Sequence, residues 1–179
     1  IRIPRALAAM LLGGALSLSG YLLQTFFHNP IAGPFVLGVS SGAKLVVALA
    51  MIFSAGIFGT LSSAMLIFSA FIGSLISLGF VLIVSRKVKQ MSMLVVCGVM
   101  IGYICSAVTD FLVTFANDSD IVNLHGWSLG SFSGMTWDNF SMAFAIVMIT
   151  FACTFLLSKP IGAYQLGESY AQSMGVNIK

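Results

Sequence analysis

The chain has 179 residues, of which 59% are hydrophobic and only 7% charged, whereas a soluble domain carries about a quarter charged residues. So few polar side chains cannot cover a water-soluble core, and the composition therefore excludes an ordinary soluble domain and indicates an integral membrane protein. The net charge of +3 comes from eight basic and five acidic residues. These stand in short groups between apolar stretches and form no single basic face, which argues against nucleic acid as a partner.

The chain ends and the cysteines also bear on its class. The chain begins at Ile1 and stops within a polar segment at Lys179, so we expect a piece of a longer protein. Its first apolar run, residues 6–27, is longer than the about 7–15 apolar residues of a signal peptide and is not interpreted as one. The cysteines fall inside apolar stretches without the spacing of a zinc site or a disulfide framework, so we interpret them as small buried hydrophobic residues. They are Cys97, Cys105 and Cys153.

Long charge-poor runs are the main signal along the chain. A helix needs about 20 apolar residues to cross a hydrocarbon core of about 30 Å. Five runs approach or exceed this length, and they predict an all-α, polytopic membrane bundle. In chain order, the predicted spans are residues 6–27, 41–58, 61–84, 91–115 and 139–158.

Helix breakers and charges mark the connections between these runs. Residues 28–34 contain two prolines and a glycine, which stop the preceding helix, and residues 54–63 can make the second turn. Arg86, Lys87 and Lys89 lie in the third connection. A short basic loop of this kind is placed in the cytoplasm by the positive-inside rule.

This basic loop predicts the orientation of every other segment. Counting crossings from it puts residues 28–34 and 159–179 in the cytoplasm and residues 116–138 outside. The acidic residues of the last of these segments agree with an external position. Arg2 and Arg5 fall outside, against the rule, which indicates either an error in the topology or a function for these two arginines.

Small residues recur at four-residue spacing within three of the predicted spans. They are Ala9 and Gly13, then Ser69, Gly73 and Ser77, and finally Gly98 and Gly102. Such spacing allows membrane helices to approach closely, so we interpret these residues as helix-packing positions ahead of any direct transport role.

We find no catalytic or metal-binding constellation in the sequence. Residues 38–44 resemble a phosphate loop, but three residues instead of four separate the glycines, so another chain must bind any ATP. His28 and His125 are interpreted as solvated loop residues. Asp110, the one acid within a span, lies near the outer end of its helix, where an interfacial role is favoured over a substrate contact.

Two segments outside the spans have helical character. Residues 120–138 contain Trp127 and Trp137 and fit a short helix lying against the membrane surface. Residues 161–175 alternate apolar and polar side chains and fit a short amphipathic helix that ends at Gly175. This second helix either docks in a groove of a partner protein or lies at the membrane interface.

Several motifs stand in a characteristic order along the chain. They are Arg2-Ile3-Pro4-Arg5; Gly13, Gly14, Ser19 and Gly20 with Gln24; Asn29-Pro30-Ile31-Ala32 with Pro34; residues 37–43; residues 94–106; residues 127–134 with Trp137; and Leu166-Gly167-Glu168 with Ala171, Met174 and Gly175. In this order and spacing they resemble the FecCD-type permeases, the membrane subunits of importers for ferric siderophores, haem and vitamin B12. The resemblance covers the whole chain.

The resemblance implies a fold and a set of partners. Permeases of this family have the type II ABC importer fold, with about ten transmembrane helices per subunit, and work as homodimers in the bacterial cytoplasmic (inner) membrane. They bind ATPase subunits on the cytoplasmic side and an extracytoplasmic substrate-binding protein on the other. The present chain would hold about half of such a permease, from its second helix to its sixth, surrounded by membrane lipid, and should not transport by itself.

The resemblance also implies roles for particular residues. Arg2 and Arg5 match positions that face glutamates of the binding protein, which would explain their external position. The turn Asn29-Pro30-Ile31, together with Ser92, matches the region that closes the cytoplasmic end of the pathway. Met91 departs from the small polar residue of some members, which weakens a gating role for it. The ATPase-coupling positions are Leu166, Gly167, Glu168, Ala171 and Gly175.

The function expected from the resemblance is ATP-driven import without covalent chemistry in this chain. ATP would be hydrolysed by the partner subunit, and no cofactor or metal is expected in this chain. The sequence does not distinguish iron-siderophore, haem and cobalamin-type cargoes. Two alternatives are an ion-coupled secondary transporter, which would need intramembrane acids or broken helices near the midplane, and a membrane scaffold that transports nothing.

Overall fold

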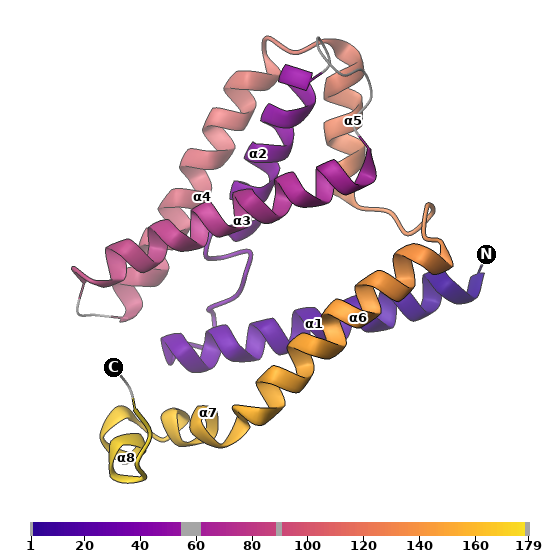
Figure 1. Cartoon of the computed structure of the whole chain (residues 1–179). Coiled ribbons are helices and arrows are strands. Elements are labelled where there is room, and N and C mark those ends of the chain that lie inside the picture. The colour runs from indigo at the N-terminus through magenta and orange to yellow at the C-terminus, as the bar shows by residue number, and fades with distance from the viewer. Residues whose placement is uncertain (1, 55–61, 89–90, 178–179) are drawn as a thin grey trace. The chain divides into compact units, whose positions relative to one another are not determined.

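The structure is a computed structural model that describes residues 2–54, 62–88 and 91–177 (Figure 1). All regular secondary structure within these ranges is α-helical. The helices are α1 (Arg2–Phe27), α2 (Val39–Ser54), α3 (Ser63–Ser85), α4 (Met91–Val113), α5 (Asp118–Leu129), α6 (Trp137–Leu156), α7 (Ser158–Gln165) and α8 (Glu168–Ser173). The predicted all-α membrane bundle is confirmed.

Four of these helices, α1, α3, α4 and α6, are long and apolar enough to cross a membrane. Helix α1 begins four residues before the predicted span at 6–27, because Pro4 lies in the first turn, where its missing N–H leaves no hydrogen bond unmade. Helix α2 is a shorter apolar helix. The last residues of its predicted span, 55–58, lie outside the described residues, as does Lys89 of the basic loop.

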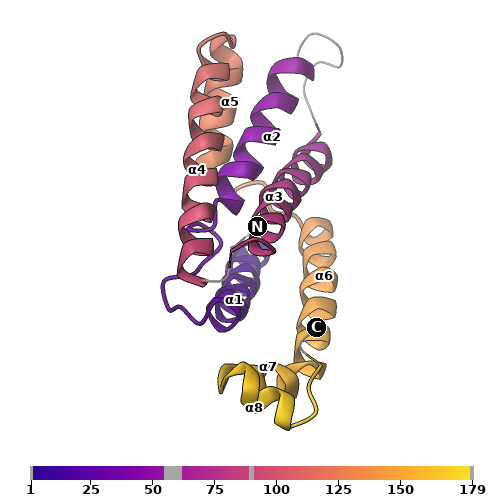
Figure 2. The same cartoon turned by 90° about the vertical axis from the view of Figure 1, so that its left-hand side faces the viewer.

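The chain divides into two compact units. The first extends to Ile31 and resumes at Phe132, and the second comprises Ala32–Ser131. In the first unit α1 packs along α6 and contacts α7, which in turn contacts α8. In the second unit α2 lies between α3 and α4 (Figure 2), and α5 packs on α2.

Close backbone contacts hold α2 against α3. A Cβ atom added at Gly73 would lie 2.3 Å from the carbonyl oxygen of Gly42, so only glycine fits there. The hydroxyl of Ser77, one turn further along α3, is buried and donates to the carbonyl oxygen of Gly38 at 3.0 Å. The packing role predicted for Gly73 and Ser77 is therefore confirmed.

The start of α2 also lies against α4. Gly38, with φ at +70°, has its Cα beside Gly102, and a Cβ at Gly98 would lie 2.9 Å from the Cα of Leu37. The packing role of the Gly98 and Gly102 pair is confirmed. A Cβ at Gly13 would meet nothing within 4 Å among the described residues, so the packing role of the Ala9 and Gly13 pair stays a prediction.

Helix α5 differs from the predicted surface helix. It ends at Leu129, so Trp137 does not belong to it but begins α6. Leu124 is 4% exposed and packs with Val47 and Ala48 of α2. Because Leu124 is buried against α2, α5 is part of the helical bundle.

The cysteines are less buried than expected. Cys97 and Cys105 on α4 are half-buried, and Cys153 on α6 is exposed. The interpretation as buried residues is therefore wrong for Cys153, because α6 packs only one side against α1 and has no buried residue.

Candidate coupling site at the end of helix α1

Helix α1 ends in a tight elbow. His28 follows the helix with φ at +47°, its backbone N–H bonds the carbonyl oxygen of Thr25, and the N–H of Asn29 bonds that of Gln24. This pair of bonds is the Schellman motif, with histidine in the left-handed position that glycine usually takes. The chain therefore leaves α1 in a defined direction.

The turn Asn29-Pro30-Ile31, predicted to close the pathway, is hydrogen-bonded to this elbow. The backbone N–H of Ile31 donates to Oδ1 of Asn29 at 3.0 Å, which is an Asx turn. The side-chain amide of Gln24 donates to the carbonyl oxygen of Pro30 at 3.0 Å. The turn is thus tied to Gln24 in the last turn of α1 through both Asn29 and Pro30.

Helix α7 reaches the same elbow. The side-chain amide of Gln165 donates to Oγ1 of Thr25 at 3.0 Å, although 140 residues separate the two in the chain. His28 Nε2 lies 3.2 Å from the carbonyl oxygen of Tyr164, and their rings are 4.9 Å apart. Thr25 is 6% exposed. The structure therefore brings the predicted gate turn and the start of the predicted coupling segment together.

The predicted single helix over residues 161–175 is two helices, α7 and α8. Gly167 separates them, because its φ of +113° is not helical. Glycine adopts this backbone conformation readily, whereas residues with a Cβ rarely do. Gly175, with φ at +81°, ends α8, and the N–H of Val176 bonds the carbonyl oxygen of Ala171. The predicted end at Gly175 agrees with this second Schellman motif.

Helices α7 and α8 present both apolar and acidic groups. Leu166 and Met174 are 69% and 64% exposed, whereas Ala171 is fully buried. Burial raises the pKa of the Tyr164 phenol above its usual range, and the negative charge and hydrogen bond of Glu168 raise that pKa further. The charge of Glu168 in α8 thus affects the Tyr164 phenol of α7 across the Gly167 break.

A cavity of about 480 Å³ lies at the elbow. Its lining, both polar and apolar, comes from α1, the turn after it and the end of α7. The lining residues are Tyr21, Gln24, Thr25, His28, Asn29, Pro30, Gln165 and Leu166.

The predicted docking residues lie at the opposite end of α1. Arg2 is exposed, whereas Arg5 is half-buried. The guanidinium of Arg5 donates to the carbonyl oxygen of Ser133 in the segment before α6. Arg5 therefore holds this segment against the start of α1, a role that the sequence did not indicate.

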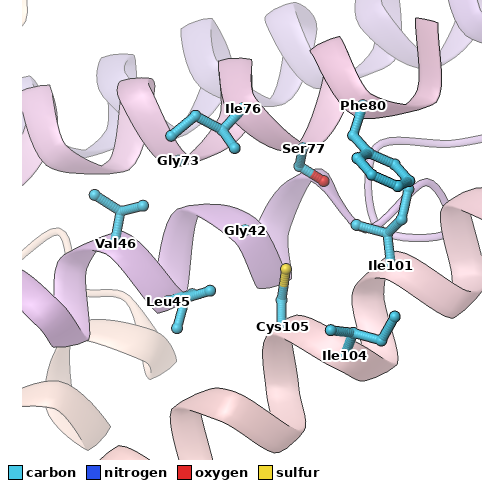
Figure 3. Close-up of a pocket in the computed structure, with 10 residues that line it drawn as sticks. All are labelled: Gly42, Leu45, Val46, Gly73, Ile76, Ser77, Phe80, Ile101, Ile104 and Cys105. Atoms are coloured by element: carbon cyan, nitrogen blue, oxygen red, sulfur yellow. The ribbon is translucent and has the colours of Figure 1, made fainter. Parts of the chain in front are cut away.

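Ser92, the remaining predicted gate residue, is exposed in the first turn of α4 and belongs to the second unit. A different feature of that unit was missed. Figure 3 shows an apolar cavity between α2, α3 and α4, with the hydroxyl of Ser77 and the thiol of Cys105 among its lining groups. Its volume is about 210 Å³.

The glycines around this cavity had a recognisable signal. Gly38 and Gly42 belong to the loop that resembles a phosphate loop and to the motif at residues 37–43, yet they also stand four residues apart, the spacing that predicts packing for Gly98 and Gly102. At the elbow, His28 was interpreted as a solvated residue. It is exposed, but it contacts Tyr164.

Together, the long apolar helices and their close glycine contacts define a multi-pass membrane protein. The sequence model of the FecCD transport family matches residues 1–179. The chain belongs to the FecCD transport family, whose members are transport permeases and not enzymes, and is a protein of the bacterial cytoplasmic membrane.

Individual relatives agree with this assignment. The chain is 34% identical to the vitamin B12 import system permease protein BtuC of Klebsiella pneumoniae subsp. pneumoniae and 35% identical to that of Citrobacter koseri, each over 99% of this chain and 53% of the relative. It thus spans about half the length of the curated relatives it matches. A metal-chelate type ABC transporter solved in an inward-facing conformation matches with a TM-score of 0.84 and 27% identity, over 99% of this chain and 56% of that one.

Proposed function

We propose that this chain forms part of the permease subunit of an ATP-binding cassette importer whose cargo is a corrinoid of the vitamin B12 type. Membership of the FecCD family supports the class of transporter. The names of the relatives support the corrinoid, and that of the structural neighbour supports a metal chelate more generally. Iron-siderophore and haem complexes are the competing cargoes within this class.

In the proposed mechanism, the ATP-binding subunit presses on α7 and α8 from the cytoplasm. Leu166, Gly167, Glu168, Ala171 and Gly175 form the coupling surface. The movement reaches the turn Asn29-Pro30-Ile31 at the end of α1, which opens or closes the cytoplasmic end of the pathway together with Ser92. The observation that supports this proposal most directly is the hydrogen bond from Gln165 to Thr25, which joins the two regions.

Other parts of the complete transporter follow from the same proposal. ATP is bound and hydrolysed by the partner subunit, and this chain binds no cofactor. Two copies of the full permease form a homodimer in the lipid membrane. On the external side, Arg2 and Arg5 face carboxylates of the substrate-binding protein, where such pairs contribute mainly steering and register. Arg2 is the better placed of the two, because Arg5 already contacts Ser133.

The coupling surface is tested in proteoliposomes that contain the complete permease with its ATPase and binding protein. We expect Leu166→Asp combined with Glu168→Arg to lower ATP-dependent cobalamin uptake at least tenfold, because the first introduces a charge into an exposed apolar contact and the second reverses a charge. Asp118→Arg, a charge reversal at an exposed residue of α5, serves as the control and should leave uptake unchanged.

Four outcomes would contradict the proposal. Full uptake by the double variant would refute the coupling surface. Uptake that continues without ATP under an ion gradient would favour the secondary transporter, and the absence of any uptake by the unmodified complex would favour the scaffold. Competition by unlabelled ferric siderophore or haem, but not by cobalamin, would refute the corrinoid as cargo.

A further inference from the structure

We infer that Thr25, His28, Tyr164 and Gln165 form a latch that transmits movement of α7 and α8 to the turn at residues 29–31. The inference rests on the proposed function and assigns these four as positioning residues. Two contacts join the last turn of α7 to the elbow at the end of α1. The Gln165 amide donates to the Thr25 hydroxyl at 3.0 Å, and His28 Nε2 lies 3.2 Å from the Tyr164 carbonyl oxygen.

On the α1 side, the latch is directly connected to the turn. The carbonyl oxygen of Thr25 accepts from the backbone N–H of His28, and that of Gln24 accepts from Asn29. The Gln24 side chain then donates to the carbonyl oxygen of Pro30. A displacement of Thr25 and His28 therefore moves the hydrogen-bonded elbow, and with it the turn at residues 29–31 that directly follows.

On the other side, the latch continues into α8. The backbone N–H of Gly167 donates to the carbonyl oxygen of Tyr164 at 3.0 Å, and the carbonyl oxygen of Gly167 accepts from the N–H of Ala171 in α8 at 3.0 Å. The connection therefore extends from α8 through Tyr164 and His28 to residues 29–31. Gly167 breaks the helix between α7 and α8, and these two backbone hydrogen bonds cross the break.

The contacts of the latch are suited to being broken and remade. A single protein hydrogen bond changes an equilibrium by about threefold to tenfold, since water replaces the partner when the bond opens. A cavity of about 480 Å³ lies beside Thr25, His28 and Gln165. Water in this cavity can bond their polar groups when the contacts of the latch open. Hydrogen bonds of this strength favour the arrangement in which α7 contacts the elbow, but they still allow the arrangement in which the contacts are open.

The first test compares Thr25→Val and Gln165→Leu in the complete transporter. Each removes the same hydrogen bond and keeps most of the side-chain volume. We expect uptake per ATP hydrolysed to fall about threefold to tenfold while ATPase activity stays within about twofold, and the double variant to resemble either single one. Gln165→Glu should retain normal coupling, because its carboxylate accepts from the Thr25 hydroxyl.

Thr150→Val is the matched control, since the Thr150 hydroxyl bonds the carbonyl oxygen of Ile146 within α6. It should leave the ratio of uptake to ATP hydrolysis unchanged. A parallel fall of uptake and ATPase activity would indicate a merely structural role and would overturn the latch, as would fully additive effects of the two single variants.

A second readout is independent of transport. Gln165→Leu should accelerate backbone hydrogen exchange of Asn29 and Ile31 by about threefold to tenfold, and Thr150→Val should not. Unchanged exchange at both amides would overturn the latch even in a transporter that imports cobalamin. Conversely, accelerated exchange in a complex that imports nothing would support the latch and refute the proposed function.

Discussion

Single glycines determine how closely α2 approaches its neighbours. Gly73 of α3 faces the backbone of Gly42, and Gly38, just before α2, faces Gly98 and Gly102 of α4. In lipid, helices gain little from burying apolar surface against each other, so close van der Waals contact between backbones is a main source of association. One added methyl group at such a contact separates the helices.

Gly73→Ala is expected to destabilise the permease by about 1–3 kcal/mol, because its Cβ would lie 2.3 Å from the Gly42 carbonyl oxygen. Gly79→Ala on the same helix is the control, since a Cβ there meets nothing within 4 Å. The measurement is thermal unfolding of the detergent-solubilised full permease. Equal unfolding midpoints for the two variants would show that the close contact between Gly73 and Gly42 does not contribute to stability.

At the scale of helices, α5 shows how a polar, Trp-containing segment can join a bundle. Only one of its side chains, Leu124, is fully buried. It packs with Val47 and Ala48, and Trp127 lies beside this cluster, partly buried. A helix with so few buried side chains depends strongly on that one contact.

We therefore expect Leu124→Ala to loosen α5, with a cost of about 2–5 kcal/mol for the lost apolar contacts and the cavity that remains. Val122→Ala is the control, since Val122 is 69% exposed. Limited proteolysis within residues 118–129 reports the change, and cleavage should increase only in the Leu124 variant. Equal protection in both variants would contradict the packing described for α5.

For the whole molecule, orientation in the membrane decides which surfaces meet which partners. The basic loop predicts that Lys87 lies in the cytoplasm and Asp118 outside. In a permease whose native cysteines are replaced, an impermeant maleimide should label Lys87→Cys only from the cytoplasmic side and Asp118→Cys only from the external side. Labelling of Lys87→Cys from outside would exchange the proposed docking and coupling faces.

The candidate site was only partly predictable from the sequence. The turn Asn29-Pro30-Ile31 and the Leu166-Gly167-Glu168 segment were found because prolines, glycines and motif order are local properties of the chain. Thr25 and Gln165 were not identified as partners, because no local signal connects two polar residues 140 positions apart. His28 was taken for a solvated residue, since its contact with Tyr164 requires α7 to return to the end of α1.

The membrane environment, the approximate spans and the family could all be predicted from the sequence, because hydrophobicity, charge and motif spacing are local properties that do not depend on distant residues. Tertiary structure decided that α5 packs on α2, that residues 161–175 form two helices, and that α7 contacts the elbow after α1. Each of these depends on how surfaces far apart in sequence fit together, and that fit is a property of the folded chain as a whole.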